Sequence, residues 1–503
     1  MILILLFGIP AFLGVVTLFI PGEERRRVRR RLLMIGAILH ALLTLALYFP
    51  GVSHSLNDYL VLDSLGFLFL SITSFLFLFV AIYSFGYFQK EHHSIPTEKG
   101  VRHLYTPCML FFLSAMTLTT MTPHLGLLWV AIEATTLATA PLIYYHHHAQ
   151  ALEAAWKYLL ICSVGIALAL LGIFFIAAAS KGSGTALFVS SFVKNAPNLD
   201  PRWLRIGFIL VLVGFGTKMG LAPLHTWLPD AHSEAPSPVS ALLSGALLNA
   251  AFLGILRCYQ ICSAAGLADF AGKLLIIFGL VSLFVAAVFI TAQRDYKRLL
   301  AYSSVEHMGI LSLGIGVGSG FGSLLHVINH SLTKGLLFLV AGQIVLTYRT
   351  KKIAEVQGLL KTLPATGILF AVGGLAIMGS PPFAPFISEF LILRDGWVHG
   401  HFIAMSLYLL FLSVIFVSMS KSLFDMIQGE KKELPSAQRE REGEAPMALP
   451  LEGATRAPII ERYGLMTFSP FVFALIVFLL GVYLPPPLVA FLKEASSLLG
   501  RPL

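Results

Sequence analysis

The sequence predicts an all-α integral membrane protein of about 14 transmembrane helices, with two inverted five-helix repeats and broken helices 7 and 12. Apolar residues make up 57% of the 503 residues and charged residues only 12%, with a mean hydropathy of +0.82. Soluble domains carry about 25% charged residues. The composition therefore excludes a soluble enzyme, a disordered chain and a nucleic-acid binder. The apolar runs are also too long for the alternating strands of a β-barrel.

Each span is placed where about 20 mainly apolar residues follow one another, which is the length that crosses a bilayer. The first is expected to be a retained helix rather than a removed signal peptide, because it lacks a basic start and an obvious cleavage site. The expected spans are 2–21, 32–49, 62–88, 106–121, 124–144, 152–179, 203–226, 237–261, 269–291, 298–317, 320–347, 364–394, 400–427 and 468–493.

Basic residues set the expected orientation of these spans. Six arginines lie between residues 25 and 31, and short loops rich in Lys and Arg stay in the cytoplasm. If successive loops alternate between the two sides of the membrane, most other basic residues fall on the same side as this loop. The net charge of +9 is then explained by membrane topology. Both termini are therefore expected outside, in the cytoplasmic (inner) membrane of a prokaryote. The polar stretch 428–466 is expected to be a cytoplasmic linker.

Gly and Pro interrupt two spans near membrane depth, in GFGTKMGLAPLHTWLP (214–229) and MGSPPFAPFISEF (378–390). Broken helices at corresponding positions, here five spans apart, indicate an inverted repeat with the transport site at the breaks. The breaking residues are Gly220, Pro223, Pro381 and Pro382. The expected segments are 1–105 (helices 1–3), 106–262 (first repeat, helices 4–8), 263–428 (second, inverted repeat, helices 9–13) and 429–503 (linker and helix 14).

Ionisable and polar side chains recur near the centres of the spans, where a charge is expensive and usually functional. The set is Glu133, Lys218, Asn249, Glu306, His307, His326, His330, Lys334 and Glu389. Each alone can be explained as a polar residue that holds helices together. Two lysines, three glutamates and three histidines at similar depth instead indicate a proton or cation relay. His326, His330 and Lys334 are four residues apart and share one helix face.

Other polar features carry weaker signals. Glu153 and Lys157, four residues apart, are expected to form an ion pair on the helix surface, or to modulate Lys218 from a distance. The four cysteines lie in apolar segments, so neither a disulfide framework nor an iron–sulfur cluster is expected. Cys258 and Cys262 are one helical turn apart and are taken as packing residues.

Two histidine-containing segments are possible metal sites, but another role is favoured for each. Consecutive side chains at 146–148 point in different directions on a helix, so a solvated loop is expected there. His225, His232 and Glu234 lie in or near PDAHSEAPSP (229–238), which is expected to be a Pro-rich loop closing the broken helix. No metal-binding or cofactor-binding residue is therefore assigned.

Several long motifs of the sequence resemble those of a known protein family. KMGLAPLHTWLPDAHSEAPSPVSALLSGALLN (218–249) resembles the signature of the antiporter-like subunits of respiratory complex I and Mrp-type cation/proton antiporters. HVINHSLTKGLLFLVAG (326–342) is similar to the eleventh-helix motif of the same family. WVAIEATTLATAPLI (129–143), LEAAWKYLLICSVGIALALLG (152–172) and AYSSVEHMGI (301–310) look more like component F of the group 4 hydrogenases, the formate hydrogenlyase and hydrogenase-4 class. The resemblance covers roughly residues 60 to 430.

The resemblance implies a fourteen-helix inverted-repeat fold and a role in proton translocation. It also implies that Glu133 pairs with Lys218, and that Glu389 leads to the outer half-channel. The eleventh-helix relay would be His326, His330 and Lys334. Asn249 stands where many relatives place a lysine, so water, or Glu306 and His307, must carry the central step.

The chain is therefore expected to be the proton-translocating membrane subunit of a hydrogenase-type, complex-I-like redox complex. Nickel–iron, iron–sulfur or flavin groups are expected only in partner subunits. The expected partners are other membrane subunits, a peripheral redox arm, membrane lipid and protons or sodium ions, and no nucleic acid. Three alternatives stay open: an Mrp-like sodium/proton antiporter subunit, a NADH–quinone oxidoreductase membrane subunit, and a membrane anchor with vestigial channel residues.

Overall fold

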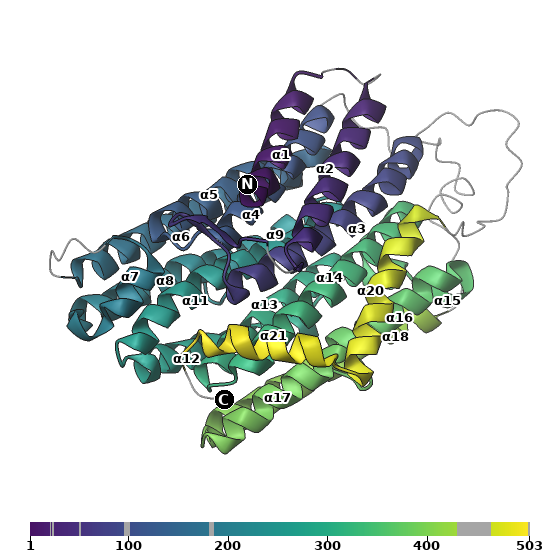
Figure 1. Ribbon diagram of the computed structural model, residues 1–503. Coiled ribbons are helices and arrows are strands. Elements are labelled where there is room, and N and C mark those ends of the chain that lie inside the picture. The colour runs from purple at the N-terminus through teal and green to yellow at the C-terminus, as the bar shows by residue number, and fades with distance from the viewer. Residues whose placement is uncertain are drawn as a thin grey trace, which may run out of the picture.

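The computed structural model describes residues 1–20, 22, 25–49, 52–94, 101–180, 186–429 and 464–500. Long helices packed side by side make up most of it (Figure 1). Among the described residues, eight helical segments are long and apolar enough to cross a membrane, and three shorter apolar helices accompany them. The all-α membrane class is thereby confirmed. The count of fourteen spans and the inverted repeats stay predictions, and most of the expected linker lies outside the described residues.

Side chains at helix starts explain several boundaries in the first half of the chain. His124, His148 and Asp200 each accept a hydrogen bond from a backbone N–H in the first turn of α5, α6 and α8, which would otherwise lack a partner. The elements are α1 Ile2–Leu18, α2 Arg26–Ala46, β1 Ser55–Asn57, β2 Leu60–Val61, α3 Ser64–Ser94, η1 Val101–Leu104, α4 Tyr105–Met121, α5 Leu125–Ile143, η2 Tyr144–His146, α6 Ala149–Ala178, α7 Val189–Lys194, η3 Ala196–Asn198, α8 Pro201–Met219, α9 Trp227–Glu234, α10 Ser237–Leu242, η4 Leu243–Leu247 and α11 Leu248–Ala264.

The second half continues in the same manner, and Asp295 caps the start of α13. Its elements are α12 Ala268–Thr291, α13 Tyr296–Gly316, α14 Gly320–Tyr348, η5 Ile353–Glu355, α15 Leu359–Thr362, α16 Pro364–Ile377, α17 Ala384–Val398, α18 Phe402–Gln428, α20 Leu465–Val482 and α21 Pro486–Ser497. Two expected boundaries are wrong. The loop 229–238 is largely helical, as α9, because Pro229 lies in the first turn, where a proline is tolerated. The last span ends at Val482 instead of 493.

Three consecutive prolines, 485–487, explain the early end of the last span, since they cannot continue α20. The chain restarts as α21, which contacts α14 and α3 and runs at an angle to α20 in Figure 1. Both expected breaks in the long helices are visible. Helix α8 ends before Gly220, whose φ is +84°, and residues 378–383 separate α16 from α17.

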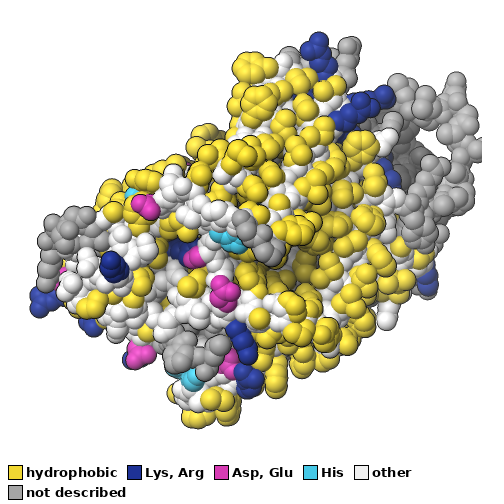
Figure 2. Space-filling model, in the orientation of Figure 1, with side chains coloured by type: hydrophobic (Ala, Val, Ile, Leu, Met, Phe, Trp, Pro, Cys, Tyr) yellow, Lys and Arg dark blue, Asp and Glu magenta, His cyan; other side chains and the backbone are white. Residues whose placement is uncertain are grey.

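Glycines allow the closest helix packing. A Cβ added at Gly172 of α6 would lie 2.7 Å from the Gly207 carbonyl oxygen of α8, and Gly279 of α12 meets Gly309 of α13 at the same separation. Small residues let membrane helices approach in this way. Hydrophobic side chains cover much of the visible face, with Lys and Arg mostly near its margins (Figure 2). This distribution suits a surface that faces lipid.

An ion pair between buried Arg257 of α11 and partly exposed Asp63 ties α11 to the start of α3. Arg257 is 4% exposed and donates to Asp63 through both terminal nitrogens, at 2.5 and 2.7 Å. Burial by itself raises the pKa of the Asp63 carboxyl. The Arg257 charge and its hydrogen bonds outweigh burial and hold that pKa below its ordinary value.

Candidate functional site

Lys218 is fully buried in the last turn of α8, directly before the first helix break. Its ammonium donates to Thr136 Oγ1 and to the Tyr158 hydroxyl, both at 2.7 Å. The Tyr158 hydroxyl also lies 2.6 Å from Thr139 Oγ1. The Tyr158 ring packs on Trp227 of α9, with ring centroids 5.0 Å apart. Helices α5, α6, α8 and α9 thus hold a single lysine side chain.

Glu133 interacts with Lys218 electrostatically and through a bridging hydroxyl, without an ion-pair contact. The Thr136 hydroxyl lies between them, because it accepts from Lys218 and donates to Glu133 Oε2 at 3.0 Å. Thr136 is one helical turn beyond Glu133 and so occupies the space between the two charges. Glu133 is half-buried and lines a cavity of about 240 Å³ between α5 and α6. The two charges are therefore linked through a hydroxyl.

Asn249 follows the π-helical turn η4 at the start of α11. Its side-chain amide donates to the Gly245 carbonyl and to Ser331 Oγ of α14, both at 2.8 Å. Lys334, four residues after His330 on α14, donates to the Leu300 carbonyl at 2.8 Å. Lys334 also interacts electrostatically with Glu306 of α13. Glu306 and Lys334 therefore influence each other across the contact between α13 and α14.

Three buried histidines from α13 and α14 come next. His307 Nδ1 lies 2.8 Å from His326 Nε2, and the rings are stacked with centroids 5.0 Å apart. The His330 ring is 5.2 Å from that of His307, and His330 Nε2 lies 3.3 Å from the Ser244 carbonyl oxygen. The predicted helix face of α14 therefore meets a histidine of α13, so polar side chains of the two helices are in contact.

Glu389, on α17 beyond the second break, is 8% exposed. Its carboxylate lies against Gly379, whose φ is +68°, at a place where any Cβ would collide with it. His307, His326 and Glu389 offer three donor atoms within 4.8 Å of one another, a set that could hold a metal ion. The two facing ring nitrogens already share a hydrogen bond, which suits proton transfer equally.

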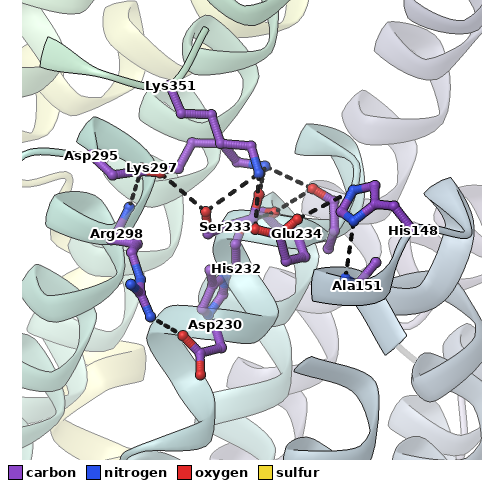
Figure 3. A network of polar contacts seen from close by, with 12 residues as sticks. His148, Ala151, Asp230, His232, Ser233, Glu234, Asp295, Lys297, Arg298 and Lys351 are labelled. Carbon is purple, nitrogen blue, oxygen red and sulfur yellow. Dashed lines mark hydrogen bonds and ion pairs between the residues drawn. The ribbon is translucent and has the colours of Figure 1, made fainter. Parts of the chain in front are cut away.

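A second network lies at the other end of the broken helix, where α6, α9 and α13 meet (Figure 3). Lys157 bonds Glu153 at 2.6 Å, the expected pair, and also Asp230 of α9 at 3.1 Å. Arg298 of α13 pairs with the same Asp230. Lys297 donates to two carbonyls at the end of α9. The charges therefore join three helices rather than lying on one helix surface.

Three histidines of the segments considered as possible metal sites take part in ion pairs or in packing: His146, His148 and His232. His148 caps α6 and lies 3.4 Å from Glu234, which also pairs with Lys351. His146 lies 3.8 Å from Glu91, and the expected loop is present at 147–148, where the His148 side chain is 44% exposed. The ring of His232 is fully buried and stacks on Phe338. Because Glu234 is turned toward Lys351 and His148, a metal site at this loop finds no support.

Hydroxyl groups are the functional candidates that the sequence did not reveal. Thr136 and Tyr158 hold Lys218, and Ser388 lies 2.9 Å from His326 Nδ1. Hydroxyls in membrane helices commonly bond the carbonyl one turn back, as Thr333 does. The composition of these helices therefore gives no signal that singles out a relay hydroxyl.

Residues 122–416 match the family model described as NADH:quinone oxidoreductase/Mrp antiporter, transmembrane. The chain is 38% identical over 457 residues to a hydrogenase-4 component F homolog of Methylacidiphilum infernorum, covering 88% of this chain and 89% of that protein. It is 31% identical over 404 residues to hydrogenase-4 component B of Escherichia coli, covering 75% of this chain and 58% of the relative.

Solved structures share the fold. A chain of an archaeal membrane-bound sulfane sulfur reductase aligns with a TM-score of 0.81 at 22% identity, covering 99% of this chain and 97% of the other. A chain of the Mrp complex from Dietzia also gives 0.81, at 19% identity and with the same coverage. A chain of Thermus thermophilus respiratory complex I gives 0.79 at 21% identity, with full coverage of both. The chain belongs to the NADH:quinone oxidoreductase/Mrp antiporter family of membrane subunits.

Proposed function

We propose that this chain is the proton-translocating membrane subunit of a hydrogenase-type, complex-I-like redox complex. The observation that supports the proposal is the presence of ionisable groups at both helix breaks, with Lys218 linked to half-buried Glu133 through Thr136 and the His307–His326 pair beside Glu389. They come from α5, from the two broken helices and from α13 and α14, which follow the first break. The name of the component F homolog supports the hydrogenase setting.

In the proposed cycle, Lys218 carries the proton that is switched. Its ammonium keeps two hydrogen bonds, and Glu133 acts on it through the Thr136 hydroxyl. Buried charges need such partners. When Glu133 and Thr136 withdraw, the ammonium loses part of its support and gives up the proton. The network around Asp230 connects this step to α6, because Lys157 adjoins Tyr158 in sequence and bonds Asp230 of α9.

Beyond Lys218, the proton passes to the groups on α13 and α14. Glu306 and Lys334 supply the central step, since the Asn249 amide already donates two hydrogen bonds and cannot take up a proton as an amine can. The histidine pair follows, and Glu389 hands the proton outward. Electrons would travel through nickel–iron, iron–sulfur or flavin groups in a peripheral arm. The proposed location is a prokaryotic cytoplasmic membrane, with both termini outside.

Lys218→Met tests the proposal, with Lys273→Met as its control because Lys273 is exposed on α12. The complex is purified from native membranes in mild detergent, its partners are identified by mass spectrometry and metal analysis, and it is reconstituted in liposomes. Proton uptake driven by its electron donor should be lost in Lys218→Met and kept in Lys273→Met. Undiminished uptake in an assembled Lys218→Met complex would overturn the relay. Sodium movement without nickel or iron partners would indicate a gradient-driven exchanger instead.

A further inference from the structure

A groove of about 430 Å³ lies between α2, α3, α14, α20 and α21, away from the charged groups described above. Each of the five helices contributes lining residues that are three or four positions apart and so share one helix face. The large apolar side chains among them are Phe75 and Leu78 of α3, Ile328 and Leu332 of α14, Leu480 of α20 and Phe491 of α21.

The groove is about as long as one leaflet of a bilayer is thick. Along α3 its lining extends from Leu68 to Leu78, which is about 15 Å at 1.5 Å per residue. The hydrocarbon core of a bilayer is about 30 Å thick. One end of the groove lies where helices end, since Tyr48 follows α2 and Leu480 is in the last turn of α20. The groove therefore extends from the ends of these helices to about the middle of the membrane.

The hydroxyl groups that line the groove are already hydrogen-bonded within the protein. Thr44 donates to the His40 carbonyl at 2.9 Å, and Ser74 Oγ lies 2.9 Å from His40 Nδ1. The Tyr48 hydroxyl lies 2.9 Å from Ser71 Oγ. An occupant of the groove therefore needs no polar groups of its own. Water gains little there, because a buried water needs free polar partners.

The mouth of the groove continues a surface of exposed apolar side chains. Leu42 and Leu45 of α2 are exposed on one flank, and Leu475 and Leu479 of α20 are exposed on the other. Lipid chains that cover such a surface have direct access to the groove. An empty groove would instead leave the atoms of its walls without contacts.

The dimensions of the groove argue against a protein partner as its occupant. A wall about 15 Å long and about 10 Å wide, the width of one helix, offers roughly 150 Å². A stable protein interface buries about 800 Å² on each side. A transmembrane helix would also need contact over the full membrane thickness, about twice the length of the groove.

We propose that this groove binds one hydrocarbon chain of a membrane phospholipid, whose headgroup lies beside Tyr48 at the end of α2. Tyrosines are enriched at this level of membrane proteins. The Tyr48 ring also packs on Phe67 of α3, with centroids 4.5 Å apart, which fixes it at the mouth. The site is independent of the proposed function, because no charged group takes part in it.

The bound chain would support the helix that carries the histidines. Ile328 and Leu332 lie on the face of α14 opposite to His326 and His330, because positions two apart point to nearly opposite sides of a helix. Helix α14 is far more buried than α3 or α20. The lipid thus packs against the back of a helix that is otherwise enclosed by protein.

A photo-crosslinking experiment tests the site in the intact complex. The complex is reconstituted in phosphatidylcholine liposomes in which one acyl chain carries a diazirine halfway along its length, and labelled peptides are identified by mass spectrometry after illumination. Label is expected on the α14 peptide that contains Ile328 and Leu332, since lipid reaches this buried helix through the groove.

Two neighbouring positions of α2 supply the variant and its control. Ala41→Phe adds a ring inside the groove and should abolish the label on α14. Leu42→Phe adds a ring of the same kind on the exposed side of the helix and should keep the label. If Ala41→Phe prevents assembly, Leu488→Phe obstructs the same groove from α21 and replaces it.

Three results would overturn the proposal. The first is an α14 peptide without label in the wild type, and the second is equal labelling of α14 in Ala41→Phe and Leu42→Phe. The third is a quinone or a partner's helix recovered in the groove in place of the phospholipid, which organic extraction and protein crosslinking of the native complex would detect.

Discussion

Thr136→Val is expected to slow proton translocation roughly ten- to a hundredfold. The Thr136 hydroxyl accepts from Lys218 at 2.7 Å and donates to Glu133 at 3.0 Å. Valine keeps the shape and removes both bonds, so the buried ammonium keeps only its bond to Tyr158. A hydrogen bond to a charged group contributes about 1.5–3 kcal/mol. Since about 1.4 kcal/mol corresponds to a factor of ten, that loss gives the stated range.

The neighbouring threonine supplies a matched control. Thr135 is equally buried, and its hydroxyl donates to the Ile132 carbonyl of the same helix at 2.6 Å. Thr135→Val therefore removes a buried hydroxyl without touching the lysine. The assay is the initial rate of proton uptake by liposomes that hold the intact complex, followed with a pH-sensitive dye and divided by the electron flux. Subunit content and Tm of each preparation report assembly.

The outcome that refutes the reasoning is a Thr136→Val complex that pumps as fast as Thr135→Val. The Thr136 hydroxyl would then have no role in proton translocation, and Glu133 would have to act on Lys218 without it. Thr136→Ser adds a second comparison, because serine restores the hydroxyl without the methyl group. Its uptake should return to within about threefold of the wild type if the hydroxyl is what matters.

The other expected effects concern the second helix break, the outer ion pair and the inner network. Gly379→Ala places a Cβ against the Glu389 carboxylate of α17 and should cut proton uptake at least tenfold. Its control is Gly400→Ala, where φ is +81° and the space is open, so the change adds only backbone strain of roughly 1–2 kcal/mol. Asp63→Asn removes the charge partner of buried Arg257, which keeps its bond to Gln260, and should lower stability by about 1–3 kcal/mol, seen as a lower Tm. Because the pKa of Asp63 is held below its ordinary value, the ion pair stabilises the wild type fully above the unfolded pKa of about 4, and this stability is lost as the pH falls through the folded pKa. Asp230→Asn removes a partner of the α6 lysine and should slow uptake several-fold, with Tm changed by only a few degrees.

Each of these expectations has an opposite result that can be observed. Equal uptake in Gly379→Ala and Gly400→Ala would show that the glycine is needed for its backbone and not for the carboxylate. At acid pH, the Tm of Asp63→Asn should depend less on pH than the Tm of the wild type. An unchanged dependence would mean that another carboxyl controls stability at acid pH. Wild-type uptake in Asp230→Asn would reduce the inner network to a structural role.

The sequence predicts the charged part of the site because a charge at membrane depth is costly and therefore informative. Lys218 stands out for that reason, and the glycine–proline breaks stand out because they interrupt apolar spans. The structure places them at the ends of α8 and α16. Hydroxyls such as Thr136 carry no comparable signal, since most of them only bond their own helix. Glu133 and Lys218 interact electrostatically, as expected, but the Thr136 hydroxyl between them could not be foreseen from their spacing.

Boundaries fail where local chemistry overrides apolar content. The stretch 468–493 is mainly apolar, but three prolines end the helix at Val482 and start another. Residues 229–238 are predicted as a Pro-rich loop, yet proline is tolerated in a first turn, and α9 forms over Trp227–Glu234. Asp230 was consequently missed, because its role depends on the helix that brings it beside Lys157 and Arg298.

Asn249 shows how the central step can survive the loss of a lysine. The amide is engaged by Gly245 and Ser331, so it holds α11 to α14 and has no hydrogen to give up as a proton. Lys334 is buried on the neighbouring helix and interacts with Glu306. That pair repeats the arrangement of Lys218 and Glu133, with the lysine and the carboxylate on different helices. Under the proposed function, this second pair supplies the central step without a lysine at position 249.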